Sequence, residues 1–373
     1  MIKIPPFVQS LKPYKAGLSI EQLAREKNLE RIVKLASAEN PLGPSPKAQA
    51  AIANAISGLH RYPDPSSYDL VHAIAKKYGV QPNHIICGHG ADALLSYIVS
   101  AFTSEQNDII TSEGTFIGIY VATRKMGRNL VRVPMKNYEF DLDGILDAIT
   151  DKTAMIYVAN PNNPTGTLIK KQDFEAFMEQ VPDHIMVILD EAYTAYATGN
   201  PDYPNGVTYD YDNMVVTRTF SKAYGLAGLR IGFAVGPDHV IEALYKVKLP
   251  FEPNNLAQVA AIAALDDEEF LQQTIDLNRK SLAMLYQCFE DNHLSYIRSS
   301  TNFILVIMDS EAEALEFASL CLDNGLIVRH VDTFGIPNGI RINSGTLDET
   351  RFAVDVISRV VHSMKRTSKT IVN

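Results

Sequence analysis

The sequence predicts an α/β protein: a large domain with a mainly parallel sheet covered by helices on both faces, followed by a smaller α+β domain. From His84 to Val235, short apolar runs alternate with amphipathic stretches of helical length. Runs of this kind are typical of parallel strands that helices bury on both faces. After Lys248 the alternation gives way to longer helical patterns and more widely spaced strands, which indicates a second domain.

The elements of the arm and of the large domain follow one another in chain order. The apolar run Ile32–Ala36 is expected to be a first strand, and Pro46–Ile56 and Asp69–Tyr78 are expected to be helices, the second ended by Gly79. The further strands are expected at His84–Cys87, Asp108–Ile110, Leu130–Val133, Met155–Val158, Ile185–Leu189, Met214–Thr217 and Ile231–Val235. The helices between them are expected near Asp92–Phe102, Phe116–Lys125, Leu142–Ala148, Lys171–Gln180 and His239–Lys246.

The second domain mixes long helices with a few strands. Its helices are expected at Asn254–Leu265, Glu268–Asn292, Ala312–Asn324 and Asp348–Met364, and its strands at Thr301–Met308, Leu326–His330 and Ile340–Asn343. We therefore expect three parts: an N-terminal arm (residues 1–35) that packs with the small domain, a large domain (36–248) and a small C-terminal domain (249–373).

Composition narrows the classes of partner. The chain has 34 Lys and Arg against 43 Asp and Glu, a net charge of −9, which argues against nucleic acid or an anionic membrane as partner. The N-terminus lacks the pattern of a signal peptide, and the uncharged run Leu94–Phe102 is too short to span a bilayer. Cys87, Cys288 and Cys321 lack the spacing of a disulfide framework or a zinc site. We expect a cytoplasmic protein with no metal.

The stretch Thr217–Gly232, TRTFSKAYGLAGLRIG, places Lys222 among small and hydroxylated residues. A lysine amine in a glycine-containing turn suits imine formation with an aldehyde. Thr219, Ser221 and Arg230 are the types of group that hold a phosphate. An aldehyde and a phosphate on one molecule indicate pyridoxal phosphate, whereas a lysine taken alone is far more often a surface residue in a loop.

The segment SKAYGLAGLRIG resembles the Schiff-base segment of fold-type I pyridoxal-phosphate enzymes, in particular of histidinol-phosphate aminotransferases. The motifs NNPTG, DEAY and GIRINSGT also resemble this family, and they occur in the expected order. The resemblance implies the fold of those enzymes, with residues 36–248 as the cofactor-binding domain. It also implies that Lys222 bonds to the cofactor aldehyde and then carries a proton between the substrate and the cofactor.

Four residues resemble the family's contacts to the cofactor ring. Asn163 and Tyr193 match residues that hydrogen-bond the ring hydroxyl, Asp190 matches the carboxylate facing the ring nitrogen, and Phe116 matches the stacking aromatic residue. A carboxylate beside that nitrogen keeps it protonated, so that the ring can accept electrons. The alternatives are structural: NNPTG is a strong turn former, Asp190 can be a helix N-cap, and Phe116 can be a core residue.

The loop GHGADALL resembles the family's phosphate-binding turn. Backbone amides at Ala91 and Asp92, at the start of a helix, are expected to hold the cofactor phosphate. The family pattern GSDE is altered, because Ala91 and Ala93 replace the serine and the acid. Tyr62 of HRYPDP is by default a surface turn residue, but it matches a tyrosine that reaches the phosphate of the neighbouring subunit. This match implies a homodimer with shared active sites.

Substrate contacts are implied at four further positions. Arg341 of GIRINSGT resembles the arginine that clamps the substrate carboxylate with two parallel hydrogen bonds, a task for which lysine is poorly shaped. Arg329 of LIVRHV and Tyr14 of LKPY match contacts to a distal phosphate, and Asn40 lies in the SAENP segment at the substrate mouth. The alternative is that each arginine pairs with an acidic residue of the protein.

Together these features predict transamination with pyridoxal 5'-phosphate, using an amino donor and a 2-oxo acid acceptor. The resemblance favours histidinol phosphate and 2-oxoglutarate as substrates, giving imidazole acetol phosphate and glutamate. Ala38 stands where the family commonly has asparagine, which reshapes the expected substrate mouth. Two alternatives stay open: an aminotransferase for aromatic or other amino acids, and a threonine-phosphate-type decarboxylase. A regulatory binding protein is disfavoured, because no basic DNA-binding stretch precedes the arm.

Overall fold

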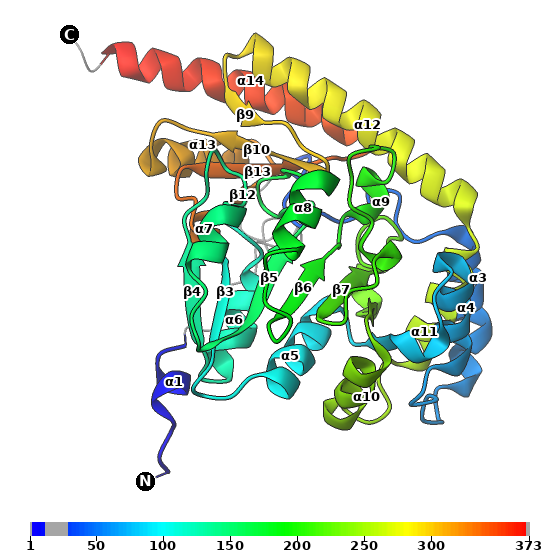
Figure 1. Ribbon diagram of the computed structural model, residues 1–373. Helices are drawn as coiled ribbons and strands as arrows, with labels where there is room; N and C mark the ends of the chain where they lie inside the picture. The colour runs from blue at the N-terminus through cyan, green and yellow to red at the C-terminus, as the bar shows by residue number, and fades with distance from the viewer. Residues whose placement is uncertain (1, 12–28, 371–373) are drawn as a thin grey trace.

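The computed structural model describes residues 2–11 and 29–370, and its larger part is built on a seven-stranded sheet (Figure 1). The strands of this sheet are β2 (Ile85–Gly88), β3 (Asp108–Ser112), β4 (Asn129–Val133), β5 (Thr153–Ala159), β6 (Met186–Asp190), β7 (Met214–Thr219) and β8 (Gly232–Val235). They lie in the order β2-β8-β7-β6-β5-β3-β4. β8 is antiparallel to both of its neighbours, and every pair from β7 to β4 is parallel. The predicted mainly parallel sheet is confirmed.

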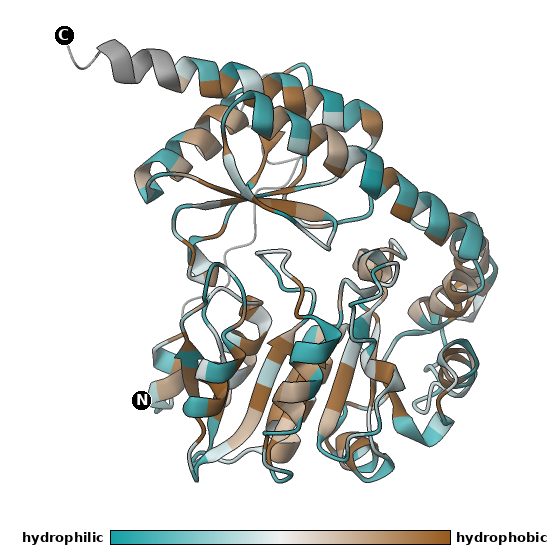
Figure 2. Cartoon of the chain, turned by 45° about the horizontal axis from the view of Figure 1, so that its top comes forward, coloured by the Kyte–Doolittle hydropathy of each residue, from teal (hydrophilic) through white to brown (hydrophobic). Residues whose placement is uncertain are grey.

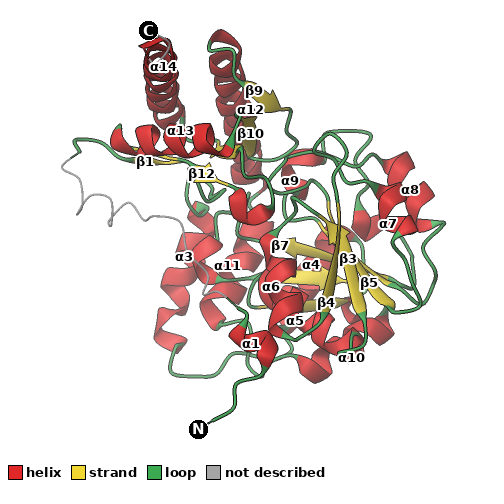
Figure 3. Cartoon of the chain, turned by 90° about the vertical axis from the view of Figure 1, so that its left-hand side faces the viewer, coloured by secondary structure: helices red, strands yellow, loops and turns green. Residues whose placement is uncertain are grey.

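Helices cover both faces of this sheet (Figure 3). The helices of the larger part are α3 (Pro46–Ala55), α4 (Tyr68–Tyr78), α5 (Ala91–Phe102), α6 (Ile117–Lys125), α7 (Leu142–Asp147), α8 (Lys171–Met178), α9 (Thr194–Ala197), α10 (Asp238–Val247) and α11 (Asn255–Leu265). α5 and α6 lie on one face, and α7 and α8 lie on the other. This division follows from the strand order, because the chain reverses its direction across the sheet after β4 and crossovers are right-handed. The reversal opens a crevice at the carboxyl ends of the strands.

Several helix ends match local sequence signals. The Ser45 hydroxyl accepts a hydrogen bond from the Ala48 amide at the start of α3, and the Asn254 side chain caps α11 in the same way. α4 ends at Gly79, whose φ of 71° is the left-handed conformation that glycine adopts without strain.

The smaller part is built on a four-stranded antiparallel sheet covered by long helices (Figure 1). Its strands are β9 (Ser295–Ile297), β10 (Phe303–Ile307), β12 (Arg329–His330) and β13 (Gly339–Asn343), in the order β12-β13-β10-β9. Its helices are α12 (Glu268–Asp291), α13 (Glu311–Asp323) and α14 (Leu347–Thr370). Among the residues that the structure describes, no helix combines the length and apolar character needed to cross a membrane.

The segment predicted as one strand, Leu326–His330, belongs to two sheets. β11 (Leu326–Ile327) pairs in parallel with β1 (Val33–Lys34) near the N-terminus, whereas β12 pairs with β13. The split brings residues 33–35 onto the smaller part of the molecule, where Val33 and Leu35 are buried in its core. The short helix α1 (Pro6–Gln9) contacts α6 of the larger part instead.

Two main apolar cores correspond to the two parts, as the distribution of apolar residues along the central strands indicates (Figure 2). The larger core continues past residue 248, because Ala257, Ala261 and Leu265 of α11 pack into it beside α3 and α4. α12 then joins the two parts: Leu271 packs on the larger core, while Leu285 is buried in the smaller one. The domain division at residue 248 stays a prediction about folding units.

Candidate active site

Three predicted site residues lie at the carboxyl ends of adjacent parallel strands. Asn163 follows β5, Asp190 is the last residue of β6, and Lys222 follows β7. Because parallel strands end at one edge of the sheet, these residues converge although dozens of residues separate them in sequence. Arg341 of β13 reaches them from the smaller part, since its Nη1 donates a hydrogen bond to the side-chain oxygen of Asn163 at 2.6 Å.

Lys222 is partly buried, and its amine lies beside Ser37 and Tyr193. Its Nζ lies 3.4 Å from the backbone oxygen of Ser37 and 5.6 Å from the centre of the Tyr193 ring. Burial, together with the positive charge of Arg341, lowers the pKa of Lys222 to about 8. An amine with this pKa is partly deprotonated near neutral pH and is available as a nucleophile or a base.

The turn that carries Lys222 depends on a glycine. Gly225 has a φ of +70°, and a side chain there would collide with the backbone carbonyl of Gly43. Asn40 stabilises the same turn. Its side-chain nitrogen donates to the Ala223 carbonyl at 2.9 Å and to the Thr274 hydroxyl of α12 at 3.0 Å. The buried Asn40 amide is thus engaged within the protein, and its predicted contact with substrate stays a prediction.

Asp190 is buried, with its carboxylate held on both oxygens. The Tyr157 hydroxyl donates to Oδ2 at 2.7 Å, and the Ala192 amide donates to Oδ1 at 3.1 Å. Burial raises the pKa of Asp190 to about 6, although both hydrogen bonds act in the opposite direction. Sequence reasoning missed Tyr157, whose signal was a tyrosine within a buried strand, since its hydroxyl needs a polar partner there.

Tyr193 has a buried hydroxyl group. Its hydroxyl makes no hydrogen bond to any residue that the structure describes. Its ring packs edge-on against Phe303 of β10, with the ring centres 5.2 Å apart. Buried hydroxyls are almost always hydrogen-bonded, so this one indicates a missing polar partner.

Thr219, Ser221 and Arg230 come together beside the start of α5, as predicted. The Thr219 hydroxyl donates to Ser221 Oγ at 3.0 Å, and Arg230 Nη1 lies 3.5 Å from the same oxygen. Arg230 Nη2 also pairs with the Asp92 carboxylate at 3.2 Å. A Cβ at Gly90 would lie 2.7 Å from that Nη2, so glycine is required for the guanidinium to approach the helix start.

The first amides of α5 add to this cluster. Ala91 and Asp92 are its first two residues, and the backbone of Gly232 in β8 passes so close that a Cβ there would lie 3.0 Å from the Ala91 nitrogen. The helix start carries partial positive charge, and the Arg230 guanidinium lies against it. Hydroxyls, amides and a cation thus converge on one small region, which is the donor set that a phosphate requires.

Arg341 and Arg329 are direct partners across β12 and β13. Directly opposed residues of an antiparallel pair project from the same face of a sheet, so the two arginines share a face. Arg341 is buried, and its Nη2 donates to the Ala36 carbonyl at 2.7 Å. Its guanidinium carbon lies 5.0 Å from the centre of the Phe303 ring. Tyr14, the other predicted phosphate contact, lies outside the described residues.

Two predicted aromatic contacts differ in their surroundings. Phe116 directly precedes α6 and is partly buried, with its ring lying over Gly118. Tyr62 is 81% exposed and stacks on Phe251, with ring centres 4.4 Å apart and planes 22° apart. Other apolar residues exposed in the same stretches of chain are Ile56, Leu59, Tyr68 and Leu249. Tyr62 and Phe251 therefore form an exposed aromatic pair.

A buried ion pair lies directly beside the predicted site residues. Arg218, next to Thr219, donates from Nε to Glu191 Oε2 at 2.8 Å and from Nη2 to the same oxygen at 2.6 Å. The remaining Glu191 oxygen accepts from the Gly206 amide at 2.7 Å, and Nη2 also donates to Asn205 at 2.6 Å. The Glu191 side chain is fully buried, so this residue, which directly follows Asp190, has a structural role in the pair with Arg218.

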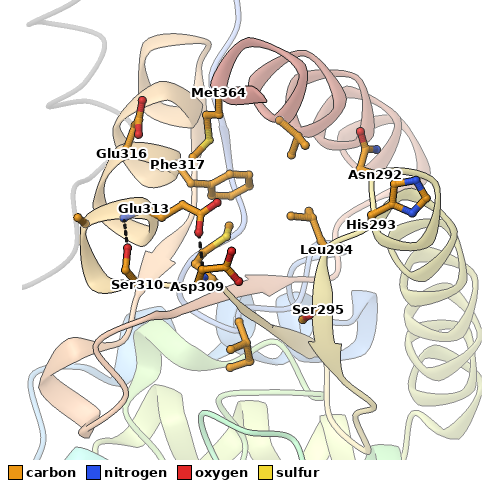
Figure 4. Close-up of a pocket in the computed structure, with 14 residues that line it drawn as sticks. Asn292, His293, Leu294, Ser295, Asp309, Ser310, Glu313, Glu316, Phe317 and Met364 are labelled. Carbon is orange, nitrogen blue, oxygen red and sulfur yellow. Dashed lines mark hydrogen bonds between the residues drawn. The ribbon is translucent and has the colours of Figure 1, made fainter. Parts of the chain in front are cut away.

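A cavity of about 550 Å³ lies elsewhere, in the smaller part (Figure 4). It is bounded by the end of α12, by β9 and β10, and by α13 and α14, with His293, Asp309 and Glu316 among its lining residues. None of the predicted site residues lines it. The candidate site is therefore defined by the polar groups that converge at the strand ends.

Comparisons with known proteins agree with this arrangement. The family model for class I and II aminotransferases matches residues 30–357. The chain is 41% identical to histidinol-phosphate aminotransferase 2 of Hydrogenovibrio crunogenus, with 97% of each chain covered. It is 39% identical to the histidinol-phosphate aminotransferase of Caldicellulosiruptor saccharolyticus, covering 95% of this chain and 99% of the relative.

The structure is also similar to a solved one. The crystal structure of histidinol-phosphate aminotransferase from Sinorhizobium meliloti in complex with pyridoxal-5'-phosphate aligns with a TM-score of 0.91 and 29% identity, covering 98% of this chain and 99% of the other. The family model spans most of the sequence, and the relatives align over nearly their whole length. This chain belongs to the class I and II aminotransferase family.

Proposed function

We propose that this aminotransferase binds pyridoxal 5'-phosphate and transfers an amino group from histidinol phosphate to 2-oxoglutarate, forming imidazole acetol phosphate and glutamate. The similarity to histidinol-phosphate aminotransferases, one of them solved in complex with pyridoxal-5'-phosphate, supports these substrates and this cofactor. The observation that carries the proposal is the position of Lys222: its amine lies 5.6 Å from the centre of the Tyr193 ring, and burial and the charge of Arg341 lower its pKa.

The residues present fit each part of the cofactor. The Tyr193 hydroxyl, buried without a partner among the described residues, and Asn163 would hold the ring hydroxyl. Asp190 would hold the ring nitrogen, and Phe116 would pack on the ring face. The donors that would hold the phosphate are the Thr219 and Ser221 hydroxyls, Arg230 and the Ala91 and Asp92 amides.

When bound, the cofactor supplies an aldehyde that takes up the amino group and a ring that accepts electrons from the substrate carbon. Lys222 Nζ holds and moves the proton, since an amine with a pKa of about 8 is partly free near neutral pH. The Asp190 carboxylate stays ionised opposite a protonated nitrogen. Burial raises the pKa of Tyr193, so its hydroxyl remains a neutral donor.

Two arginines on one sheet face suit substrates with anionic groups. Arg341 is planar, buried and already oriented by Asn163 and Ala36, which prepares it for a bidentate contact with a carboxylate or a phosphate. Arg329 adds a second cation beside it. Histidinol phosphate carries a phosphate and 2-oxoglutarate carries two carboxylates, so one pair of arginines can bind both substrates in turn.

We further propose that two copies of the chain form a homodimer with shared active sites in the cytoplasm. The exposed, stacked pair Tyr62 and Phe251 supports this, because contiguous exposed apolar side chains mark interaction surfaces. In this arrangement Tyr62 of one subunit contacts the cofactor phosphate of the other. The described cysteines are free and buried, as suits a reducing compartment.

The proposal is tested by supplying the cofactor-loaded enzyme with 2-oxoglutarate and, separately, histidinol phosphate, phenylalanine or tyrosine, and by measuring glutamate. Histidinol phosphate is expected to give the highest kcat/KM. Preference for phenylalanine or tyrosine would instead indicate an aromatic aminotransferase, and release of carbon dioxide without glutamate would indicate a decarboxylase.

Arg329→Ala tests the phosphate contact. It is expected to raise KM for histidinol phosphate far more than KM for phenylalanine. The matched control is Arg359→Ala, on the exposed side of α14, which should change neither value. Equal losses for both substrates in Arg329→Ala would remove the phosphate role.

A further inference from the structure

Tyr157 contacts the carboxylate of Asp190 from the neighbouring strand. In the register of β5 and β6, Ala159 is opposite Asp190, so Tyr157 lies two residues back on the same face of the sheet. This diagonal position is within reach of a long aromatic side chain. The hydroxyl of Tyr157 accordingly lies 2.7 Å from Asp190 Oδ2, and both side chains are buried.

The contact completes a two-point attachment of the carboxylate. Oδ1 accepts from the Ala192 amide at 3.1 Å, and Oδ2 accepts from Tyr157. With a donor on each oxygen, rotation of the carboxylate about its bond to Cβ breaks at least one hydrogen bond. Each oxygen retains a further lone pair for another donor. The group is therefore fixed in orientation and still able to accept a proton-bearing nitrogen.

The chemistry of Tyr157 suits a permanent donor. Burial and the charge of Asp190 raise the pKa of Tyr157 well above its ordinary value, so the phenol stays protonated. Its hydrogen bond stabilises the charged form of Asp190, whereas burial of the carboxylate favours the neutral form. A neutral Asp190 would lose its ionic attraction for a protonated ring nitrogen.

We propose that Tyr157 is a positioning residue that keeps the Asp190 carboxylate ionised and oriented toward the ring nitrogen of the bound cofactor. The inference rests on the proposed function, because it assigns to Asp190 the contact with that nitrogen. Tyr157 acts through Asp190 and does not touch the reacting atoms. Its loss is expected to weaken cofactor binding and slow turnover while leaving substrate KM nearly unchanged.

The test compares Tyr157→Phe with the matched control Tyr120→Phe. Tyr120 is another buried tyrosine of the larger core, but its hydroxyl donates to the Ser112 carbonyl at 2.9 Å. The first measurement is the pKa of Asp190 in the cofactor-free protein, by infrared spectroscopy of its carboxyl band, identified by loss of that band in Asp190→Asn. Tyr157→Phe should raise this pKa, and Tyr120→Phe should not.

The second measurement is the dissociation constant of pyridoxal 5'-phosphate at neutral pH. Loss of one hydrogen bond to a charged group predicts an increase of about 10-fold or more in Tyr157→Phe and none in the control. Wild-type values of both quantities in Tyr157→Phe would overturn the inference, as would equal changes in Tyr120→Phe. Failure of the wild-type protein to bind the cofactor would instead contradict the proposed function, so the two failures are distinguishable.

Discussion

Replacing Glu191 by methionine is expected to leave the Arg218 guanidinium buried without its counter-ion. The pair is nearly inaccessible to solvent, with side-chain exposures of 0% for Glu191 and 4% for Arg218. Removing one member of a buried ion pair costs about 3–5 kcal/mol, because the remaining charge is desolvated and uncompensated. The matched single variant is Arg218→Met, which leaves the Glu191 carboxylate in the same position.

For a chain of this length, the average unfolding entropy converts that loss into a fall in Tm of about 4–6 °C. The double variant should lose less than the sum of the two single variants, since no unpaired charge remains. It should not recover fully, because the Asn205 side chain loses a partner and the buried Gly206 amide loses its acceptor, the latter at about 1–3 kcal/mol.

The assay is thermal unfolding followed by far-UV circular dichroism, a suitable probe because the chain has no tryptophan. The difference between wild type and each single variant should change little between low and high salt, since buried charges are weakly screened. Single variants that unfold within about 1 °C of wild type, or a double variant equal to the sum, would refute the reasoning.

Three other predictions concern groups of the site. Gly90→Ala should weaken pyridoxal 5'-phosphate binding measurably in titrations, because the new Cβ displaces Arg230, whereas Gly79→Ala has a similar positive φ but open space and should cost only about 1–2 kcal/mol of stability. Asp190→Asn should raise the Tm of the cofactor-free protein above pH 6. The pKa of Asp190 is raised in the folded protein, so its ionised form, which predominates above that pH, opposes folding. The same variant should abolish tight cofactor binding. Lys222→Met should raise the Tm of the cofactor-free protein below pH 8, and this gain should shrink between pH 8 and 10.5. The reason is that the pKa of Lys222 is lowered in the folded protein, so in that interval the unfolded wild-type protein binds more protons than the folded one. A gain in Tm that does not depend on pH in either variant would contradict the assigned pKa shift.

The sequence predicted the strand-end residues well because their convergence follows from the fold. Once the strands are parallel, the residues after β5, β6 and β7 must meet at one edge, which brings Asn163, Asp190 and Lys222 together. The cluster of Thr219, Ser221 and Arg230 beside the start of α5 was also foreseeable, since α5 follows β2, which pairs with β8 just beyond Arg230.

Contacts that depend on long-range geometry were not foreseeable. The hydrogen bond from Arg341 to Asn163 requires the smaller part to close on the larger one, and no local pattern specifies that approach. The partner of Tyr157 depends on the register between two strands, and the pairing of Glu191 with Arg218 requires knowledge of which face each side chain occupies. The strand Leu326–His330 was predicted whole because its apolar pattern continues through the point at which it changes sheets.

The Asn40 contacts show a similar limit. A motif match indicates where a residue lies in a family, but it does not say whether its polar atoms are already used. Here the Asn40 amide joins the Lys222 turn to α12 through Ala223 and Thr274. These hydrogen bonds indicate that Asn40 holds the turn in place, and its contact with substrate stays a prediction.

The central claim is that Lys222 bonds covalently to the cofactor. The most direct measurement is borohydride reduction of the enzyme loaded with pyridoxal 5'-phosphate, followed by mass spectrometry of its peptides. The account predicts a cofactor adduct on Lys222 that is absent in Lys222→Ala and retained in Lys248→Ala, a control at another lysine whose pKa burial lowers. An adduct on a different lysine, or one that persists in Lys222→Ala, would contradict the account.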